Sequence, residues 1–592
     1  MMTNTHYDAV VVGSGFGGSV MAYKLARANL RVRVLERGKI YPPFSFPRSP
    51  HEMSTNFWDP SEGLYGMFDV WTFRGSRWSL KGIEAVVGSG LGGGSLIYAN
   101  VLLRKDRSWF VKEDLENGGY EYWPITRDDL EPHYDEAEKM LGAQRYPFEE
   151  YEPYNATSKT EVFRRLGSHL GLEWGLPPLA VTFGNKNEPP IPGVAIHEEQ
   201  PNLHHKERYT CRLCGECDIG CNYGSKNTLD FNYLSDAQRL GAEISTLSEV
   251  RTFRPGISGS DDGYTITFVE HKPQTRQGVQ MDTSKLPEHT ITADRLILSA
   301  GTLGSTYLLL RMKDQFPNLS EQLGTRFSGN GDLLSFMVNC RENRDGELVP
   351  RIMDPSRGPA ITSYLRSKDE LDGGPGRGFY IEDAGYPAFL SWIIEMNAPS
   401  AVRRVGRMVV RRLWNVVLGI PASNLSGEIS RVFGTGALSS SSLPMLGMGR
   451  DVPDGRLWLD GRYLNSDWTI AESKPYFRRL RKTMRRIAKT LRGKFVDNPI
   501  WGLSRVITVH PLGGCPMGRN RDEGVVDTHG RVFGYPGLYV ADGSVMPGPV
   551  GPNPSLTIAA VASRFADGVI ADAAASSSDQ RSGGETDPGV SK

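Results

Sequence analysis

The 592-residue chain lacks an excess of charge of either sign, because 68 lysine and arginine residues balance 68 aspartate and glutamate residues. A net charge of zero gives no global reason to expect a nucleic-acid partner. The sequence also lacks a run of about 20 apolar residues, which a membrane-spanning helix needs. Its N-terminus shows no cationic and apolar signal segment. We therefore expect a cytoplasmic protein.

Cysteine is scarce as well, with six residues in the whole chain, yet four of them form one tight cluster. Cys211, Cys214, Cys217 and Cys221 have the spacing C-x2-C-x2-C-x3-C, the run that binds iron–sulfur clusters in bacterial ferredoxins. Clustered thiols without an export signal favour a reducing compartment over disulfides. A structural zinc ion is an alternative, although zinc sites prefer separated CxxC pairs. A thiol-rich loop without metal is the third interpretation.

Glycine is abundant, with 67 residues, and a first glycine-rich motif lies near the start of the chain. The pattern predicts a strand, a tight turn, a helix and a second strand over residues 7–12, 13–18, 20–28 and 32–36. In such a unit Gly13 allows the turn, Gly15 lets a pyrophosphate approach the backbone and Gly18 permits close packing of the helix on the strand. Glu36 ends the second strand, where a carboxylate accepts from ribose hydroxyls. These residues predict dinucleotide binding.

Further pieces of the same kind lie far along the chain. A second cluster has five glycines within residues 88–95, which indicates backbone pressed against a ligand. Residues 295–302 predict a buried strand followed by a helix over 303–312, and residues 537–543 predict a short strand followed by a helix over 556–572. The predicted fold class is α/β, with a Rossmann-like domain assembled from discontinuous segments. The intervening segments would form a second, α+β domain with a mixed or antiparallel sheet and helices.

A chain of this length needs two or more domains. We assign the nucleotide-binding domain to residues 1–110, 222–315 and 520–572. The second domain takes residues 111–221, which include the cysteine-rich segment 211–221, and residues 316–519. Residues 573–592 are small and polar, and we expect them to be disordered.

Five motifs make the chain resemble the glucose–methanol–choline (GMC) oxidoreductases and, within that family, the cholesterol oxidases. They are VVGSGFGGS at 11–19, VGSGLGGGSL at 87–96, SAGTLGS at 299–305, VHPLGGCPMG at 509–518 and YVADGSVMPGPVGPNPSLTIAA at 539–560. The resemblance covers nearly the whole chain up to about residue 572. It implies that the Rossmann-like domain binds FAD and that the protein oxidises an alcohol by hydride transfer to the flavin.

The resemblance also assigns roles to individual residues. It implies that Gly13, Gly15, Gly18 and Glu36 hold the ADP part of FAD, and that Gly93, Gly94 and Ser95 lie along the pyrophosphate and flavin. Val250 would meet the adenine through its backbone, and Asp542 and Gly543 would meet the pyrophosphate and ribityl chain. The chain departs from the sterol oxidases at Tyr98, where they have an asparagine; here Asn100 follows two residues later.

Three residues are candidates for the chemistry. The resemblance makes His510 and Asn553 the catalytic pair, with the histidine as base and the asparagine orienting the substrate oxygen. A loop histidine and a helix-capping asparagine are the structural alternatives. Glu382 is placed like a glutamate that moves a proton during isomerisation of a steroid double bond, which a buried carboxyl group with a raised pKa can do. A solvated acid at a strand end is its alternative.

The resemblance extends to the cysteines. GMC dehydrogenases that feed cytochromes carry a 3Fe–4S cluster on a C-x5-C-x3-C run, which Cys211, Cys217 and Cys221 reproduce. Cys214 would then be spare, or would be a fourth ligand of a 4Fe–4S cluster. Asn222 stands where bacterial ferredoxins have a proline after the run. Such a cluster would pass electrons to an acceptor protein or a quinone.

Two basic stretches complete the pattern. Residues 402–418 carry five arginines opposite apolar residues at helical spacing. They predict a helix that either packs on its domain or lies on an anionic membrane as a peripheral contact. Residues 474–494 predict a core-packing helix with a solvated basic face.

The sequence thus predicts an FAD-dependent oxidoreductase that acts on a hydrophobic secondary alcohol, such as a sterol or hydroxysteroid. Two alternatives remain at this point. One is a dehydrogenase for an alcohol or sugar that sends electrons through an iron–sulfur cluster to an acceptor other than oxygen. The other is a flavin-holding isomerase or binding protein without net redox turnover.

Overall fold

The computed structural model describes residues 5–73, 81–256, 263–273, 281–388 and 437–582, together with single residues between 390 and 414. The basic stretch 402–418 lies outside the described residues except for 406, 407, 410 and 414. Among the described residues, no helix is long and apolar enough to cross a membrane.

The first sheet has seven strands, which come from the start, the middle and the end of the chain. Its strand order is β12-β2-β1-β15-β14-β13, and β26 also pairs with β15. The strands are β1 (His6–Val12), β2 (Val32–Leu35), β12 (Glu243–Ser245), β13 (Ser248–Pro255), β14 (Tyr264–Glu270), β15 (Glu288–Leu298) and β26 (Leu538–Val540). β1, β2, β12, β15 and β26 run parallel. β14 pairs antiparallel with β15 on one side and with β13 on the other. This parallel core is Rossmann-like, as the sequence predicted.

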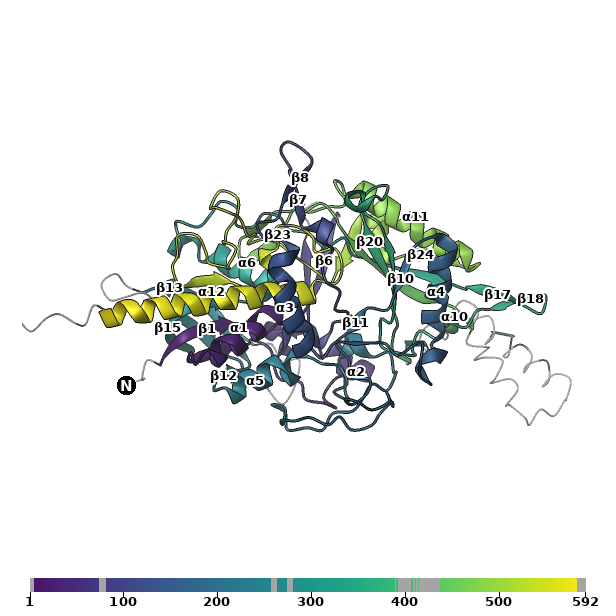
Figure 1. Cartoon of the computed structure of the whole chain (residues 1–592), viewed down its shortest axis with the longest axis horizontal. Helices are drawn as coiled ribbons and strands as arrows, with labels where there is room; N and C mark the ends of the chain where they lie inside the picture. The colour runs from purple at the N-terminus through teal and green to yellow at the C-terminus, as the bar shows by residue number, and fades with distance from the viewer. Residues whose placement is uncertain are drawn as a thin grey trace, which may run out of the picture.

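Helices cover this sheet. α1 (Phe16–Arg27) lies between α5 (Tyr233–Arg239) and α12 (Ser555–Ser582), so Figure 1 shows the last helix of the chain beside the first. α6 (Gly301–Arg311) follows β15 directly. α12 extends ten residues into the segment 573–592, so the prediction of disorder is wrong for residues 573–582. Residues 573–575 are alanines, which have the highest helix propensity and continue the helix into the segment whose small, polar residues suggested disorder.

The second sheet has six antiparallel strands in the order β10-β19-β20-β21-β16-β24. The strands are β10 (Glu173–Gly175), β16 (Leu333–Val338), β19 (Tyr364–Ser367), β20 (Phe379–Asp383), β21 (Leu443–Gly449) and β24 (Lys494–Asp497). α11 (Lys474–Thr490) packs on it through buried Phe477, Leu480 and Met484, as the sequence predicted for this basic helix. α4 (Ser158–Leu170) packs against β10, β19 and β20.

A third sheet crosses the boundary between the two domains that the sequence assigned. β5 (Phe68–Phe73) and β6 (Gly82–Gly88) come from the nucleotide-binding segments, and β25 (Arg505–Thr508) comes from the other domain. In addition, α3 (Arg127–Met140) belongs to the range 111–221 but packs on α12, where the Tyr134 hydroxyl lies 2.9 Å from Thr557 Oγ1. The two domains are therefore interleaved more closely than their sequence ranges suggest.

The remaining elements are short. Two-stranded pairs are β3–β4 (Trp58–Asp59, Leu64–Tyr65), β7–β8 (Val111–Glu113, Tyr120–Tyr122), β9–β11 (Gln144–Arg145, Pro178–Leu179), β17–β18 (Arg341–Arg344, Glu347–Pro350) and β22–β23 (Leu457–Asp460, Tyr463–Ser466). The short helices are α2 (Pro50–Ser54) and α10 (Ala437–Ser440).

Candidate active site

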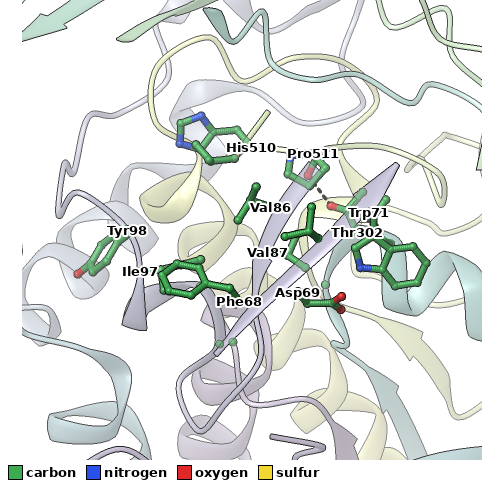
Figure 2. A pocket seen from close by; sticks show the side chains of 18 of the residues that line it. Phe68, Asp69, Trp71, Val86, Val87, Ile97, Tyr98, Thr302, His510 and Pro511 are labelled. Atoms are coloured by element: carbon green, nitrogen blue, oxygen red, sulfur yellow. Dashed lines mark hydrogen bonds between the residues drawn. The ribbon is translucent and has the colours of Figure 1, made fainter. Parts of the chain in front are cut away.

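A cavity of about 1460 Å³ runs between the three sheets. Its walls combine the first glycine loop, the start of α6, β5 and β6 of the third sheet, and β16 and β21 of the second sheet. Figure 2 shows part of this wall, with His510 beside Pro511, whose carbonyl accepts a 2.7 Å hydrogen bond from the Thr302 hydroxyl. Both ends of the chain therefore meet in one cavity.

The first glycine loop is packed tightly against the ends of two neighbouring strands. A methyl group added at Gly13, whose φ is +96°, would lie 2.3 Å from the carbonyl oxygen of Ser299, and one at Gly18 would lie 2.0 Å from that of Gly13. Gly15 differs, because such a methyl group would meet none of the described residues within 4 Å apart from its own chain neighbours. Gly13 and Gly15 line the cavity, whereas Gly18 serves helix packing. Gly15 thus leaves room for a ligand beside the N-terminus of α1.

Glu36 is hydrogen-bonded to the first glycine loop, which is in turn hydrogen-bonded to the second. Its Oε2 accepts hydrogen bonds from the Ser14 backbone N–H at 3.0 Å and the Ser14 hydroxyl at 2.6 Å, and its Oε1 accepts from the Gly38 N–H at 2.8 Å. The Ser14 hydroxyl in turn accepts from the Gly92 N–H at 3.0 Å. Glu36 lines the cavity, and Oε1 can accept a further hydrogen bond, so a ribose hydroxyl remains a suitable partner.

The second glycine loop makes a sharp turn beside the cavity. Gly93 has a φ of +52° and lines the cavity with Gly94, where an added methyl group would meet no described residue within 4 Å beyond its chain neighbours. Ser95 does not line the cavity. Its hydroxyl donates to the Gly92 carbonyl at 2.7 Å and accepts from the Leu229 N–H at 3.2 Å. The hydroxyl of Ser95 therefore stabilises the turn, and a contact of this residue with the cofactor remains a prediction.

The remaining predicted cofactor residues lie on the same cavity. Val250 on β13 lines it, as do Asp542 and Gly543 at the end of β26. Asp542 Oδ1 accepts from the Ser544 N–H at 2.8 Å and its Oδ2 from the Ser305 hydroxyl at 2.5 Å. Burial raises the pKa of the Asp542 carboxyl group. Asp542 therefore links the end of β26 to the first turns of α6.

These residues fit an extended dinucleotide such as FAD. At Gly15, Gly94 and Gly301 an added methyl group would meet open space, and all three positions line one continuous cavity. The N-termini of α1 and α6 both adjoin it, and their backbone N–H groups favour the negative charge of a pyrophosphate. Glu36 and Val250 border the part of the cavity where a ribose and an adenine would lie.

His510 is oriented by a buried carboxylate that the sequence did not reveal. Its Nδ1 lies 2.9 Å from Oδ1 of Asp332, which is 1% exposed. Oδ2 of Asp332 accepts from the Val509 N–H at 2.9 Å and from the Thr508 hydroxyl at 3.0 Å. A carboxylate accepts hydrogen bonds, so it holds the proton on Nδ1 and leaves Nε2 as an acceptor. His510 and Asp332 both line the cavity.

Asn553 lines the same cavity, and Glu382 lies behind it. The Asn553 Nδ2 donates to Glu382 Oε2 at 3.4 Å, whereas Asn553 Oδ1 and Glu382 Oε1 have no hydrogen-bond partner in the described part of the chain. Glu382 is fully buried, and this burial raises the pKa of its carboxyl group well above its usual value. The three predicted catalytic residues are therefore brought to one region, with Glu382 reached through Asn553.

Comparison with known proteins supports a single family. A family model for GMC oxidoreductases matches residues 453–562, and one for NAD(P)-binding Rossmann-like domains matches residues 11–41. The GMC-type oxidoreductase y4nJ of Sinorhizobium fredii is 42% identical over 575 residues, which cover 95% of this chain and 94% of the relative. The chain belongs to the GMC oxidoreductase family. It is an FAD-dependent oxidoreductase that acts on CH–OH groups.

Two other GMC comparisons are informative. The chain is 29% identical to cholesterol oxidase of Mycobacterium tuberculosis over 574 residues, 95% of this chain and 90% of the relative. A solved formate oxidase from Aspergillus oryzae has a TM-score of 0.57 at 14% identity and covers 97% of this chain and 99% of its own. At that identity the structure supports the shared fold alone.

The four clustered cysteines of this GMC oxidoreductase surround one small cavity of about 20 Å³. All of them are free thiols, and burial raises the pKa of Cys211 and Cys217. The Ala360 N–H donates to Cys217 Sγ at 3.4 Å. Within the described ranges, no group of three or more His, Cys, Asp or Glu side chains is arranged to hold a metal ion. The four cysteines thus line one small cavity, and the described residues offer no site for a single ion such as zinc.

The cysteine segment also reaches the active-site cavity. Asp218 lines that cavity from the turn Cys217–Ile219 and has an exposed side chain, and desolvation by the surrounding protein raises the pKa of its carboxyl group to about 6. Tyr98 lines it too, with its hydroxyl donating to the Asn227 carbonyl at 3.3 Å. Asn100 is fully buried, does not line the cavity, and has no partner for its carboxamide among the described residues.

Sequence reasoning missed Asp332 and Asp218. Asp332 precedes β16 outside any recognisable motif, and its partner His510 is 178 residues away. Asp218 lies between two cysteines that drew attention to metal binding. A polar residue at the start of an apolar strand was the available signal for Asp332.

Proposed function

We propose that this GMC oxidoreductase oxidises a hydrophobic secondary alcohol, with a sterol or hydroxysteroid as the best match. The supporting observation is the apolar cavity wall next to His510 and Asn553. This wall comes from β16 and β21 and comprises Leu334, Phe336, Val338, Leu443 and Leu446. Binding of a hydrocarbon skeleton is favourable at such a wall, because apolar surface is removed from water. Binding of a sugar is unfavourable there, because its hydroxyl groups would be buried without hydrogen-bond partners. The similarity to a cholesterol oxidase agrees with this substrate class.

His510 acts as the base in the proposed mechanism. FAD, when bound, supplies N5 of the flavin as the acceptor for the hydride from the carbinol carbon. Asp332 keeps the proton on His510 Nδ1, so Nε2 can accept the hydroxyl proton of the alcohol. Asp332 also stabilises the positive charge that the imidazole then carries.

Asn553 orients the substrate oxygen. Its Oδ1 and one N–H of its carboxamide remain available, because the other N–H is directed at Glu382. Burial raises the pKa of the Glu382 carboxyl group, so its ionised form is a strong base. The carboxylate takes a proton from one carbon of a bound steroid ketone and then returns that proton to another carbon, which shifts the double bond as a second step. We assign Glu382 this proton-transfer role.

Anaerobic flavin reduction tests the proposal. We expect cholesterol in detergent to bleach the bound flavin of the wild-type protein, and D-glucose to bleach it far more slowly. A His510→Ala variant should still bind FAD but should reduce it about 10²- to 10⁴-fold more slowly, because general base catalysis is lost. His197→Ala, at an exposed histidine, is the matched control.

Each alternative has its own outcome in this experiment. Wild-type rates in His510→Ala would refute the assigned base. Faster reduction by glucose than by cholesterol would refute the substrate class. Failure of every alcohol to bleach the flavin would support a flavin-holding isomerase without redox turnover.

A second candidate is a dehydrogenase with an iron–sulfur cluster, and it is supported by four free cysteines that line one small cavity. Cys211, Cys217 and Cys221, with or without Cys214, would hold a 3Fe–4S or 4Fe–4S cluster that accepts electrons one at a time. An acceptor protein or a quinone would then oxidise the enzyme. Iron and acid-labile sulfide in anaerobically purified protein, with little peroxide formed in air, would support this candidate. A flavin spectrum without iron would eliminate it.

A further inference from the structure

Asn330 holds the loop that leads to Asn553. Its side chain is fully buried. Oδ1 accepts a 2.8 Å hydrogen bond from the Gly551 N–H, and Nδ2 donates to the carbonyls of Pro552 at 3.1 Å and Gly551 at 3.3 Å. One carboxamide thus binds three backbone groups in the two residues that precede Asn553.

The same segment also orients His510. Asp332, two residues after Asn330, carries the carboxylate that faces His510 Nδ1. Side chains of a strand alternate between its two faces, and the cavity is lined at every second position by Asp332, Leu334, Phe336 and Val338. Asn330 lies in the turn that leads into this strand, two residues before Asp332. One stretch of chain therefore contacts the Asn553 loop, the histidine and the substrate wall.

The backbone of this segment is itself fixed. Asn330 has a φ of +54°, a left-handed conformation that asparagine tolerates better than most residues. Its carbonyl accepts from the Gly449 N–H at 3.0 Å, and the Gly331 carbonyl accepts from the Tyr476 hydroxyl at 2.8 Å. A methyl group at Gly331 would lie 2.5 Å from that hydroxyl oxygen. The backbone that carries the Asn330 side chain is therefore rigid.

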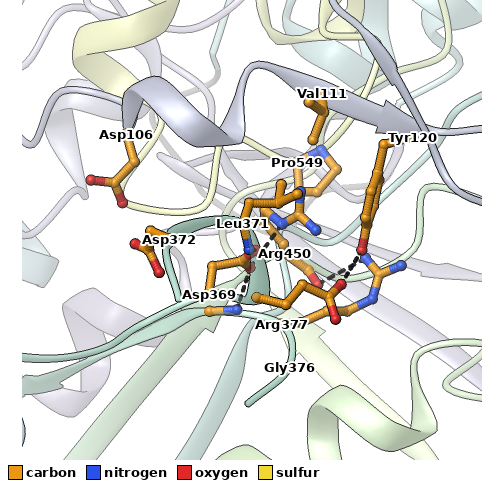
Figure 3. Close-up of polar contacts among 12 residues, drawn as sticks. Asp106, Val111, Tyr120, Asp369, Leu371, Asp372, Gly376, Arg377, Arg450 and Pro549 are labelled. Carbon is orange, nitrogen blue, oxygen red and sulfur yellow. Dashed lines mark hydrogen bonds and ion pairs between the residues drawn. The ribbon is translucent and has the colours of Figure 1, made fainter. Parts of the chain in front are cut away.

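Lys105 holds the first half of the same loop. Its fully buried Nζ donates to the carbonyls of Pro549 at 2.7 Å and Val550 at 3.1 Å. Figure 3 shows the neighbouring buried ion pair of Arg450, whose Nε donates to Asp369 Oδ2 at 3.1 Å. Together, Lys105 and Asn330 bind every backbone carbonyl from residue 549 to residue 552.

We propose that Asn330 is a positioning residue, which sets the carboxamide of Asn553 relative to the imidazole of His510. This inference rests on the proposed function of that pair. The two catalytic side chains lie 43 residues apart in sequence, but both are tied to residues 330–332. Removing the Asn330 carboxamide frees the Asn553 loop and leaves the contact between Asp332 and His510 in place. A misplacement of about 1 Å at a reacting group can reduce the rate on the order of 10²-fold.

The test compares two glycine variants at matched positions. Asn330→Gly removes the carboxamide, and glycine accepts the positive φ without strain. Asn339→Gly is the control, because Asn339 has the same φ of +54° at the other end of β16 and is exposed. With cholesterol and FAD-loaded protein, we expect Asn330→Gly to lose about 10²-fold in limiting flavin reduction. Its alcohol dissociation constant and the midpoint of its pH profile should stay near those of the control.

Equal limiting rates in the two variants would overturn the proposal, and so would a shifted pH midpoint, which indicates an action through His510. If Asn330→Gly does not take up FAD, Asn330→Asp replaces it, since that variant keeps the acceptor for Gly551 and loses both donated hydrogen bonds. A wild-type rate in Asn330→Asp would overturn the proposal, and a reduced rate would support it. Loss of FAD in both variants would show a purely structural role and would also overturn it.

Asn553→Ala, measured in parallel, separates this inference from the proposed function. Wild-type flavin reduction in Asn553→Ala would refute the catalytic pair itself, whatever Asn330 does. A slow Asn553→Ala variant beside a fast Asn330→Gly variant would refute the role of Asn330 alone.

Discussion

At the scale of single residues, the titratable groups of the site differ in how well hydrogen bonds compensate for their burial. His510 faces Asp332, and the second oxygen of Asp332 is occupied by Thr508 and Val509. Glu382 is fully buried and has one hydrogen bond, from Asn553 at 3.4 Å. A carboxyl group with so little compensation is more stable in its neutral form. Ionisation of the Glu382 carboxyl group should therefore lower the free energy of unfolding.

Glu382 predicts how stability depends on pH. Its folded pKa is raised by burial above the unfolded value of 4.5, so stability is complete below pH 4.5 and falls as the pH rises toward the folded pKa. Glu382→Gln cannot ionise and should remove this part of the decline. Each unit of pKa shift corresponds to about 1.4 kcal/mol. The measurement is the Tm of both proteins between pH 5 and about pH 9, with exposed Glu347→Gln as control. Parallel curves for wild type and Glu382→Gln would contradict the account.

At the scale of elements, neighbouring glycines of the first loop have different tasks. A methyl group at Gly17 would lie 1.6 Å from the carbonyl oxygen of Ala541, at the end of β26. A methyl group at Gly15 would meet only the cavity. Gly17 therefore allows α1 to approach the C-terminal strand, whereas Gly15 leaves room for a ligand.

Substitutions at these two glycines should separate an effect on folding from an effect on cofactor binding. Gly17→Ala should lower the Tm strongly, because overpacking against a backbone oxygen costs about 1–3 kcal/mol or more. Gly15→Ala should keep the Tm of the apoprotein and lose FAD affinity. Thermal unfolding of both apoproteins and a flavin titration of each provide the measurements. A Gly15→Ala protein that binds FAD as tightly as wild type would show that the cofactor does not approach this turn.

Local patterns made several elements predictable from sequence. α1, α6 and α11 follow from apolar periodicity and from the glycines that precede the first two, and the first glycine loop follows from its own spacing. What escaped sequence reasoning depends on distant contacts. The Ser95 hydroxyl is hydrogen-bonded to Gly92 and Leu229, and the pairing of β25 with β6 joins segments on both sides of a predicted domain boundary. No local pattern encodes such partners.

At the scale of the whole molecule, the cavity depends on interleaved segments. The first sheet takes strands from the start, the middle and the end of the chain, and the third sheet ties it to the domain that carries β16. A ligand that fills this cavity contacts all of these segments. Because it binds the folded state alone, it should stabilise the molecule as one unit.

The most direct test of this account is a titration of the apoprotein with FAD and with FMN, followed by flavin fluorescence and by the Tm. FMN lacks the AMP part of FAD, for which Gly15, Glu36 and Val250 line the cavity. We predict that FAD binds and raises the Tm, and that FMN binds at least about 100-fold more weakly, a difference of roughly 2.7 kcal/mol. A protein that takes up neither flavin, or that binds FMN as tightly as FAD, would contradict the claim that both ends of the chain build one FAD site.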